Sequence, residues 1–346
     1  MCNMAAYVGQ QQAAPELIKM LQLQEGLAGG HYTGIATLHE GKIYMAKVCG
    51  DCQELLKRTD ALKLPGTVGI AHSRTPGIPL DNWAQPFLSS DGQTVFCSNG
   101  IGPNGVLPDR ADFMREMADK LIQAGFSFNT GVPDELPAYI KLNDNLTYHT
   151  TEIAGTIVSY YNRSMPLAEA LIREFSEIPN QVASLAMSVR EPDKVFALRY
   201  NQSLFYGRKD GACCLATSGT ALQELDFKWI APVPAGSVST LSQNGIEVLG
   251  MDCFIDKLTV LPDLQNIWKF LDSYFADGQA HGVIDAYDEL VKHPELDPPG
   301  MVAQDSFAIY TYLMEKLRRG ELRQGVRQVP GSMPGSMRTE TTFELP

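Results

Sequence analysis

The chain has 346 residues, of which 44% are hydrophobic, and a formal net charge of −12. This length predicts two domains, or one large domain with an appendage, and the hydrophobic content is ordinary for a globular protein. The acidic balance argues against broad binding to nucleic acid, and no apolar run approaches the length of a spanning helix, so we expect neither a nucleic-acid nor a membrane partner.

The first 100 residues are predicted to consist of strands and turns. Short apolar or alternating runs there are bounded by Gly, Asp or Pro, which is the pattern of strands. The runs are residues 5–8, 34–38, 42–48, 68–71 and 95–97. Residues 39–41 lie between two of these runs and are predicted to form a hairpin turn.

Helices are predicted to follow. One begins near residue 108, carries Phe113, Met117 and Leu121 on one face, and ends at Gly125. Two more are predicted at residues 151–161 and 166–175. Strands then return at residues 181–189, 195–200, 203–208, 212–217, 229–233, 237–242 and 245–249. Strands, then helices, then strands favour antiparallel sheets layered with helices, an α+β fold.

The composition changes after about Phe254. Apolar residues at helical spacing predict helices at 262–275 and 306–319, the second ending at Gly320. The remaining residues are rich in Arg, Gly, Pro, Ser and Thr and lack the apolar content to fold alone. We therefore expect a domain at residues 1–254, a helical appendage at 255–319 and an extended or disordered tail at 320–346.

The seven cysteines are an odd number in a long chain. The N-terminus lacks the pattern of a signal peptide, so we expect reduced thiols and a cytoplasmic location. Cys49 and Cys52 form a lone CxxC pair without partners at zinc-site spacing. No glycine-rich phosphate loop is present, and the sequence predicts neither a metal nor another cofactor.

Cys2 directly follows Met1 and is the first candidate for chemistry. Removal of Met1 would place the thiol and a free α-amine on one residue. The α-amine has a pKa of about 8 and a thiol of about 8.5, so the amine can accept the thiol proton without a histidine partner. A cysteine at position 2 more often has no catalytic role, so this interpretation depends on the rest of the sequence.

Asn99 and Gly100 offer a side-chain amide and a backbone N–H at a turn, donors suited to an oxyanion. Taken alone, they are more often an ordinary Asn-Gly hairpin turn. Arg74 follows an apolar strand and has the planar fork that fits a carboxylate; the alternative is a surface arginine. His72 is interpreted as structural, pointing away from the substrate face or packed in the core.

Several segments resemble motifs of the class II glutamine amidotransferases, whose nucleophile is an N-terminal cysteine, and they occur in family order over roughly residues 2–250. The start, MCNMAAYVG, resembles the family's MCGIxGYxG, and residues 29–47, GGHYTGIATLHEGKIYMAK, resemble its RGYDSAGIAV hairpin. Residues 69–79, GIAHSRTPGIP, resemble the GIxHTRWATHG glutamine loop and keep its arginine. FCSNGI at 96–101 resembles VxHNGI, and LFYGRKDGACCLATSGTAL, within residues 198–222, resembles the family's PLxIGxxxxxxxxASDxxAL sheet.

The resemblance implies the four-layer αββα sandwich of N-terminal-nucleophile hydrolases, to which the predicted C-terminal helical appendage is added. It implies that Cys2 is the nucleophile, that Asn99 and Gly100 form the oxyanion hole, and that Arg74 holds the α-carboxylate of glutamine. Thr75 and Gly77 then belong to the loop over the glutamine pocket.

The sequence departs from the family pattern at some of these positions. Thr75 replaces the family's Trp, residues 77–79 replace Thr-His-Gly, and Ser98 replaces a His. The best counterpart of the aspartate that binds the substrate ammonium is Thr150, which makes residues 126–148 an insertion.

A hydroxyl cannot replace that carboxylate, because a charged hydrogen bond contributes about 1.5–3 kcal/mol, or one to two decades of affinity. Asp134 and Glu135 in the insertion are candidates to supply the charge. If they do not, the substrate is another amide.

Relatives of this type carry large acceptor domains, such as the two sugar isomerase domains of glucosamine-phosphate synthases. None fits into the residues after Phe254. The leading prediction is therefore a glutaminase-type amidohydrolase that acts on a small-molecule amide and passes ammonia to a separate synthase subunit. The alternatives are a hydrolase of a different amide with a remodelled pocket, and a catalytically silent regulatory or binding subunit.

Overall fold

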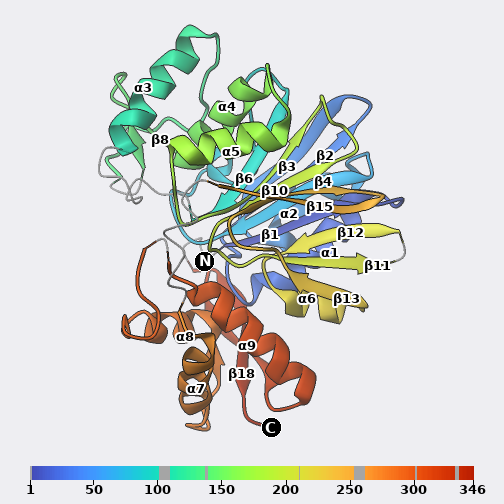
Figure 1. The fold of residues 1–346 in the computed structure, drawn as a ribbon, viewed down its shortest axis with the longest axis vertical. Coiled ribbons are helices and arrows are strands. Elements are labelled where there is room, and N and C mark those ends of the chain that lie inside the picture. Colours follow the sequence, from blue (N-terminus) through green and yellow to red (C-terminus); the bar gives the residue numbers. More distant parts are fainter. Residues whose placement is uncertain are drawn as a thin grey trace.

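The computed structural model describes residues 2–100, 110–136, 139–209, 211–252, 262–300, 302–331 and 335–346. Two antiparallel sheets face each other at its centre (Figure 1). The strands of the first are β1 (Asn3–Val8), β2 (Tyr32–His39), β3 (Lys42–Cys49), β4 (Val68–Arg74), β11 (Phe205–Lys209), β12 (Ala212–Ala216) and β13 (Trp229–Pro232). This seven-stranded sheet has the order β13-β11-β12-β1-β4-β2-β3, so the N-terminal strand lies in its middle.

The second sheet has six strands in the order β15-β14-β10-β9-β6-β5. These strands are β5 (Phe87–Leu88), β6 (Thr94–Asn99), β9 (Ala183–Ser188), β10 (Val195–Arg199), β14 (Ser237–Ser242) and β15 (Gly245–Gly250). A separate two-stranded ribbon pairs β7 (Ile140–Lys141) with β8 (Thr147–Tyr148).

Helices cover the outer faces of both sheets. Helices α1 (Ala13–Glu25), α2 (Cys52–Arg58) and α6 (Gly219–Glu224) pack on the first sheet. Helices α4 (Thr150–Asn162) and α5 (Leu167–Glu177) pack on the second, and α3 (Arg110–Gln123) packs on α4. The result is a four-layer αββα sandwich.

Strand β1 shows why the layers form. Its residues are all buried, and alternate side chains point to opposite faces of a strand. Met4 and Ala6 join the apolar cluster between the two sheets, whereas Ala5 and Tyr7 join the cluster beneath α1. A strand that is buried on both faces belongs in the middle of a sheet between two layers.

The predicted fold class is confirmed, and so is the hairpin at residues 39–41: β2 and β3 pair directly, and Glu40 and Gly41 both have positive φ angles. The prediction that the first 100 residues hold only strands and turns is wrong, because α1 and α2 lie there. Ala14, Leu17, Ile18 and Leu21 recur at helical spacing and form the buried face of α1.

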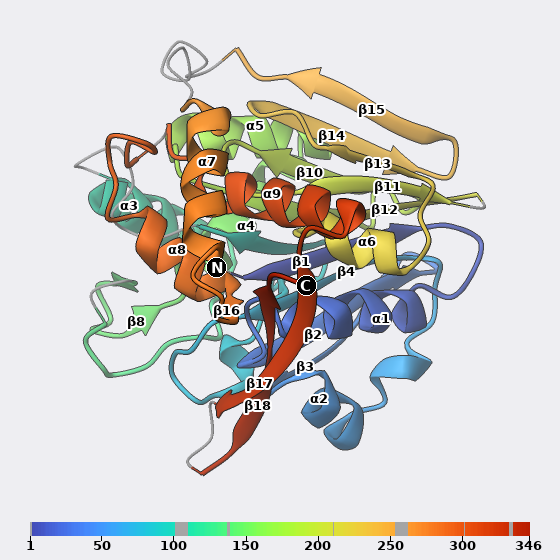
Figure 2. The same ribbon diagram turned by 90° about the horizontal axis from the view of Figure 1, so that it is seen from below.

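The C-terminal elements pack against the sandwich at the end where β1 begins (Figures 1 and 2). They are α7 (Leu264–Phe275), α8 (Val283–Leu290), α9 (Asp305–Arg319) and a three-stranded sheet of β16 (His281–Gly282), β18 (Met337–Glu344) and β17 (Arg323–Pro330). Helix α9 contacts α6, α7 and α8, and ends at Gly320, whose left-handed conformation suits a glycine.

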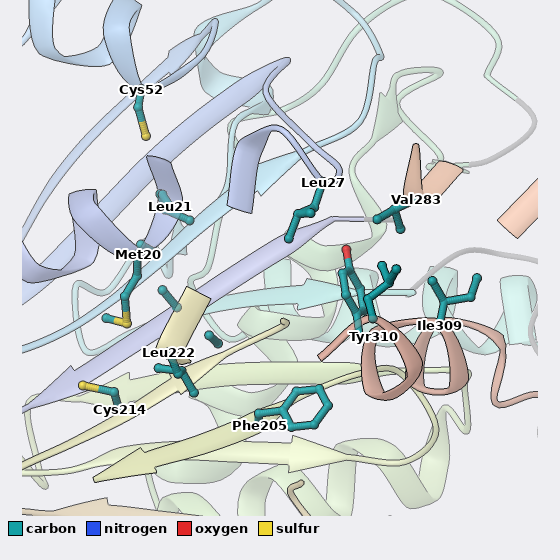
Figure 3. Close-up of a cluster of buried hydrophobic side chains, with 14 of the residues drawn as sticks. Met20, Leu21, Leu27, Cys52, Phe205, Cys214, Leu222, Val283, Ile309 and Tyr310 are labelled. Atoms are coloured by element: carbon teal, nitrogen blue, oxygen red, sulfur yellow. The ribbon is translucent and has the colours of Figure 1, made fainter. Parts of the chain in front are cut away.

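These elements share one apolar core with the sandwich. The side chains of Val283, Ile309 and Tyr310 lie in the same buried cluster as Leu21 and Phe205 (Figure 3). In the region expected to be an extended or disordered tail, β17 and β18 form a hairpin over residues 323–344 with the intervening residues 332–334 outside the described ranges. None of the helices within the described ranges is both long and apolar enough to cross a membrane.

Candidate active site

Cys2 is half-buried and lies directly before β1. Its backbone nitrogen donates to Asn99 Oδ1 at 3.3 Å, and its Sγ lies 4.0 Å from Thr75 Oγ1. The pairing of β1 with β4 brings Asn3 opposite Ser73, and β6 ends at Asn99 on the facing sheet. Cys2, Thr75 and Asn99, which are far apart in sequence, therefore meet where β1 begins and where β4 and β6 end.

Asn99 has a polar group without a protein partner. Its side chain is buried, and although Oδ1 accepts from Cys2, Nδ2 makes no hydrogen bond within the described residues. Gly100 has a φ of 101°, and a Cβ there would lie 2.0 Å from the carbonyl oxygen of Gln181. A side chain at this position would therefore clash with backbone, so the turn requires glycine.

The environment of Cys2 favours its thiolate. Burial raises the pKa of Cys2, but the His72 side chain and its charge, the N-terminal ammonium and the backbone N–H of Thr75 lower it, and the balance brings it to about 6. The thiolate is the nucleophilic form, so Cys2 is set to react at neutral pH.

His72 lies on the same face of β4 as Arg74, because side chains two residues apart on a strand point the same way. The interpretation that it points away from the substrate face is wrong, although it is fully buried. Its Nε2 lies 3.1 Å from the carbonyl oxygen of Ser98, which fixes Nε2 as the donor. Its Nδ1 makes no hydrogen bond within the described ranges, so we attribute the effect of His72 on Cys2 to proximity and charge.

Alkylation of Cys2 by iodoacetamide should follow a titration with a midpoint near pH 6. The thiolate fraction rises as the pH passes the pKa, so His72→Gln, which removes a side chain that lowers the pKa of Cys2, should shift the midpoint upward. Peptide mass spectrometry separates Cys2 from Cys97 and Cys214, whose pKa values are raised by burial and which should react slowly. A wild-type midpoint near the ordinary value of 9.0 would contradict this assignment.

Arg74 is a buried cation that the protein holds in place through neutral groups. Its guanidinium donates to the carbonyl of Trp83 at 3.0 Å and to Tyr139 Oη at 2.6 Å, and it lies 4.7 Å from the centre of the Tyr32 ring. No carboxylate of the described residues lies within ion-pair distance of it. Since an unpaired buried charge is costly, this arrangement suits an anionic ligand group.

The other predicted substrate residues lie around this guanidinium or at the start of α4. A Cβ on Gly77 would lie 2.9 Å from Arg74 Nη2, so the loop passes directly over the cation. Thr150 is fully buried as the first residue of α4. The preceding His149 packs its ring against Trp83 and Tyr139.

Burial, followed by the charge of Arg74, lowers the pKa of His149 well below its ordinary value, so this ring is neutral. The described groups that contact Arg74 are therefore aromatic or backbone groups, and none of them is a carboxylate. The expected acidic residues are not among them. Asp134 and Glu135 are exposed, and Glu135 pairs with Lys141 at 2.8 Å. The segment predicted to be an insertion supplies Tyr139 instead.

Sequence reasoning missed Tyr32, Trp83, Tyr139 and His149 as neighbours of Arg74. Only Tyr32 could have been found, by extending the predicted strands 34–38 and 68–71 as far as Tyr32 and Arg74, which pair in the structure. The described cysteines are all free, and within the described ranges no group of three His, Cys, Asp or Glu side chains is placed to hold a metal ion.

Comparisons with known proteins agree with the fold. No family model matches the chain. It is 28% identical over 219 residues to a glutamine–fructose-6-phosphate aminotransferase (isomerizing) of Pyrococcus horikoshii, covering 63% of this chain and 32% of the relative. It is also 28% identical over 257 residues to the protein of that name from Caldanaerobacter subterraneus, covering 72% of this chain and 38% of the relative. The chain thus spans about a third of the length of these relatives.

Solved structures share the fold. The glutamine phosphoribosylpyrophosphate amidotransferase of B. subtilis, complexed with ADP and GMP, superposes with a TM-score of 0.58 at 15% identity, over 92% of this chain and 64% of that one. An allosteric regulatory enzyme of purine biosynthesis gives 0.56 at 16% identity, over 85% and 63%. The chain is therefore similar in sequence to these aminotransferases and shares its fold with these amidotransferase and purine-biosynthesis enzyme structures.

Proposed function

We propose that this protein hydrolyses the side-chain amide of glutamine through a thioester on Cys2. One observation carries the proposal: the nitrogen of Cys2 lies 3.3 Å from Asn99 Oδ1, while Nδ2 of the same amide is buried without a partner. The geometry pairs a thiol of lowered pKa with an unused donor, which is what an acyl-transfer site needs. The similarity to glutamine–fructose-6-phosphate aminotransferases supports glutamine as the amide.

In the proposed mechanism, Arg74 binds the substrate carboxylate and the Cys2 sulfur attacks the amide carbon. The α-amine exposed by loss of Met1 takes the thiol proton and returns it to the amide nitrogen, which leaves as ammonia. Asn99 Nδ2 and the Gly100 N–H stabilise the oxyanion of each tetrahedral intermediate. Water then attacks the thioester, which releases glutamate and regenerates the thiol.

We further propose that the ammonia goes to a separate synthase subunit in the cytoplasm. The chain matches only about a third of the aminotransferase relatives, and its C-terminal elements are bound into the amidotransferase-like core. In this proposal the acceptor site belongs to that synthase subunit.

Ammonia release from glutamine by the purified protein, alone and with candidate synthases, tests this function. Intact mass should show loss of Met1, and a glutamine-analogue chloroketone should label Cys2. No release under any condition, together with absent labelling, would rule out the enzyme and favour a silent regulatory or binding subunit.

Because no carboxylate of the described residues pairs with Arg74 or lies among its contacts, a second candidate is the hydrolysis of an amide that carries a carboxylate but no ammonium. Substrates of this class include glutaramate and N-acylated glutamine. Comparing their kcat/KM with that of glutamine decides between the two, because an ammonium without a counter-charge weakens binding by about one to two decades. A preference for glutamine would exclude this second candidate.

Replacing Arg74 by Gln should raise KM by about tenfold to a hundredfold and leave kcat nearly unchanged, because a charged hydrogen bond to the substrate carboxylate is lost in ground state and transition state alike. Initial rates over a range of substrate concentrations measure both constants. Arg163→Gln is a suitable control, since Arg163 is a half-exposed cation that pairs with Asp91 away from the site. An unchanged KM in the Arg74 variant would contradict the assigned role.

A further inference from the structure

The C-terminal hairpin carries an arginine with two unused hydrogen-bond donors. The side chain of Arg338, in β18, is only 15% exposed, and its Nε and Nη1 are buried without a hydrogen-bond partner among the described residues. Its Nη2 lies 3.5 Å from Glu340 Oε1. Glu340 also pairs with Arg327, which has a second carboxylate, Asp285, at 2.6 Å. Arg338 therefore shares one carboxylate with another arginine, and two of its donors lack an acceptor.

The fold holds this arginine against the sandwich. The backbone N–H of Thr341 donates to the carbonyl of Gly26 at 2.7 Å, which ties β18 to the end of α1 (Figure 2). A Cβ on Gly30 would lie 3.7 Å from Arg338 Cδ, so the arginine stem passes over the backbone of residue 30. Burial, and then the charge of Arg338, lower the pKa of the neighbouring His31 to about 4, so this ring is neutral.

Arg338 lines a cavity that adjoins the candidate active site. The volume of this cavity is about 440 Å³, within the range of small-molecule sites. Its walls come from both parts of the chain and include Thr75, Pro76, Ile284, Tyr287, Val329, Pro330 and Arg338. Thr75 Oγ1 also lies 4.0 Å from Cys2 Sγ. The cavity and the nucleophile therefore share a neighbour, Thr75.

The charges around Arg338 favour this cavity over two others that the same residue lines. One of the others is lined by three carboxylates, those of Glu25, Asp51 and Glu224. In the second, the cations Lys57 and Arg58 are already paired with carboxylates. Among the described residues that line the cavity beside Thr75, Asp288 is the one carboxylate, and it is exposed. An anion next to Arg338 therefore meets least repulsion in this cavity.

A buried donor without an acceptor is unfavourable, and a guanidinium binds carboxylate and phosphate oxygens more strongly than neutral acceptors. We propose that the cavity beside Thr75 binds a small molecule through a carboxylate or phosphate group held by Arg338. The uncharged body of this ligand packs on the apolar wall of Ile284, Val329 and Pro330. Arg74 is not among the residues that line this cavity, so the site is separate from the proposed glutamine pocket and goes beyond the amidohydrolase function.

Isothermal titration calorimetry of the full-length protein with inorganic phosphate, and separately with propionate, tests the site at constant ionic strength. The wild type should bind at least one of these anions, and the tighter of the two identifies the group that the ligand carries. Arg338→Gln should weaken this binding by about tenfold to a hundredfold, the effect of losing a charged hydrogen bond. A wild type that binds neither anion overturns the proposal.

Two other arginines provide the controls. Arg323, on the neighbouring strand β17, is exposed and pairs with Glu344 at 3.2 Å, so Arg323→Gln should leave anion binding unchanged. Arg74→Gln should also leave it unchanged, because Arg74 does not line the cavity. Equal weakening in the Arg323 and Arg338 variants would reduce the effect to general surface charge. Loss of binding in Arg74→Gln alone would place the anion in the glutamine pocket. Either result overturns the proposal.

Asp288→Asn tests the location of the anion without altering the hairpin. Of the three cavities that Arg338 lines, Asp288 lines only the one beside Thr75. Removing its negative charge should tighten anion binding by about twofold to fivefold, the size of an exposed charge interaction. This measurement keeps the proposal testable even if a fall in melting temperature shows that Arg338→Gln disturbs the hairpin. Binding that is unchanged or weaker in Asp288→Asn would place the anion elsewhere and overturn the proposed site.

Discussion

Replacing Cys2 by alanine is expected to reduce ammonia release from glutamine by about 1,000-fold or more, because loss of a nucleophile removes the covalent pathway entirely. The loss should appear in kcat, with KM little changed, since Arg74 still holds the substrate. A coupled glutamate dehydrogenase assay measures the rate. Any residual hydrolysis would come from the oxyanion donors acting on water.

Cys97→Ala provides the matched control. Cys97 is buried in β6 two residues before Asn99, and burial raises the pKa of its thiol, so it is not a competing nucleophile. This variant should keep its activity after correction for the folded fraction. Activity that survives in Cys2→Ala, or a fully active wild type that retains Met1, would contradict the mechanism, because an acylated nitrogen on Cys2 cannot act as the base.

The sandwich could be predicted because its signals are local. Alternating and apolar runs mark strands, and the order of the motifs sets the αββα arrangement. The position of His72 could also have been predicted, because side chains two residues apart on a strand point to the same face and His72 is two residues before Arg74. Helix α1 could also have been predicted, because Leu17 and Leu21 are four residues apart, which is helical spacing.

The remaining site residues could not be predicted from local patterns. Tyr139 reaches Arg74 from a segment 65 residues away. Such a contact depends on how the segment before β7 packs, and the sequence around a single aromatic residue does not indicate its partner. The sequence did indicate that an acidic residue is missing at Thr150. In agreement, the described neighbours of Arg74 are aromatic, and none of them is a carboxylate.

Replacing Asn99 by alanine should lower kcat by about 100- to 1,000-fold, the usual effect of losing one oxyanion donor. The donor is aimed at charge that develops only in the transition state, so KM should change little. Stability should also change little, because Nδ2 has no protein partner to lose and the bond between Oδ1 and the Cys2 nitrogen is 3.3 Å long.

Asn162→Ala separates this role from a general effect of removing a buried amide. Asn162 donates to the carbonyl of Met165 at 3.0 Å and accepts from Ser188 at 2.6 Å, so its loss should lower the melting temperature and leave kcat unchanged. The two asparagines should therefore show opposite patterns, one in rate and one in stability. If Asn99→Ala instead lost stability and kept its kcat, its amide would be a structural turn residue, and the oxyanion would have to be stabilised by Gly100 and by donors other than Asn99.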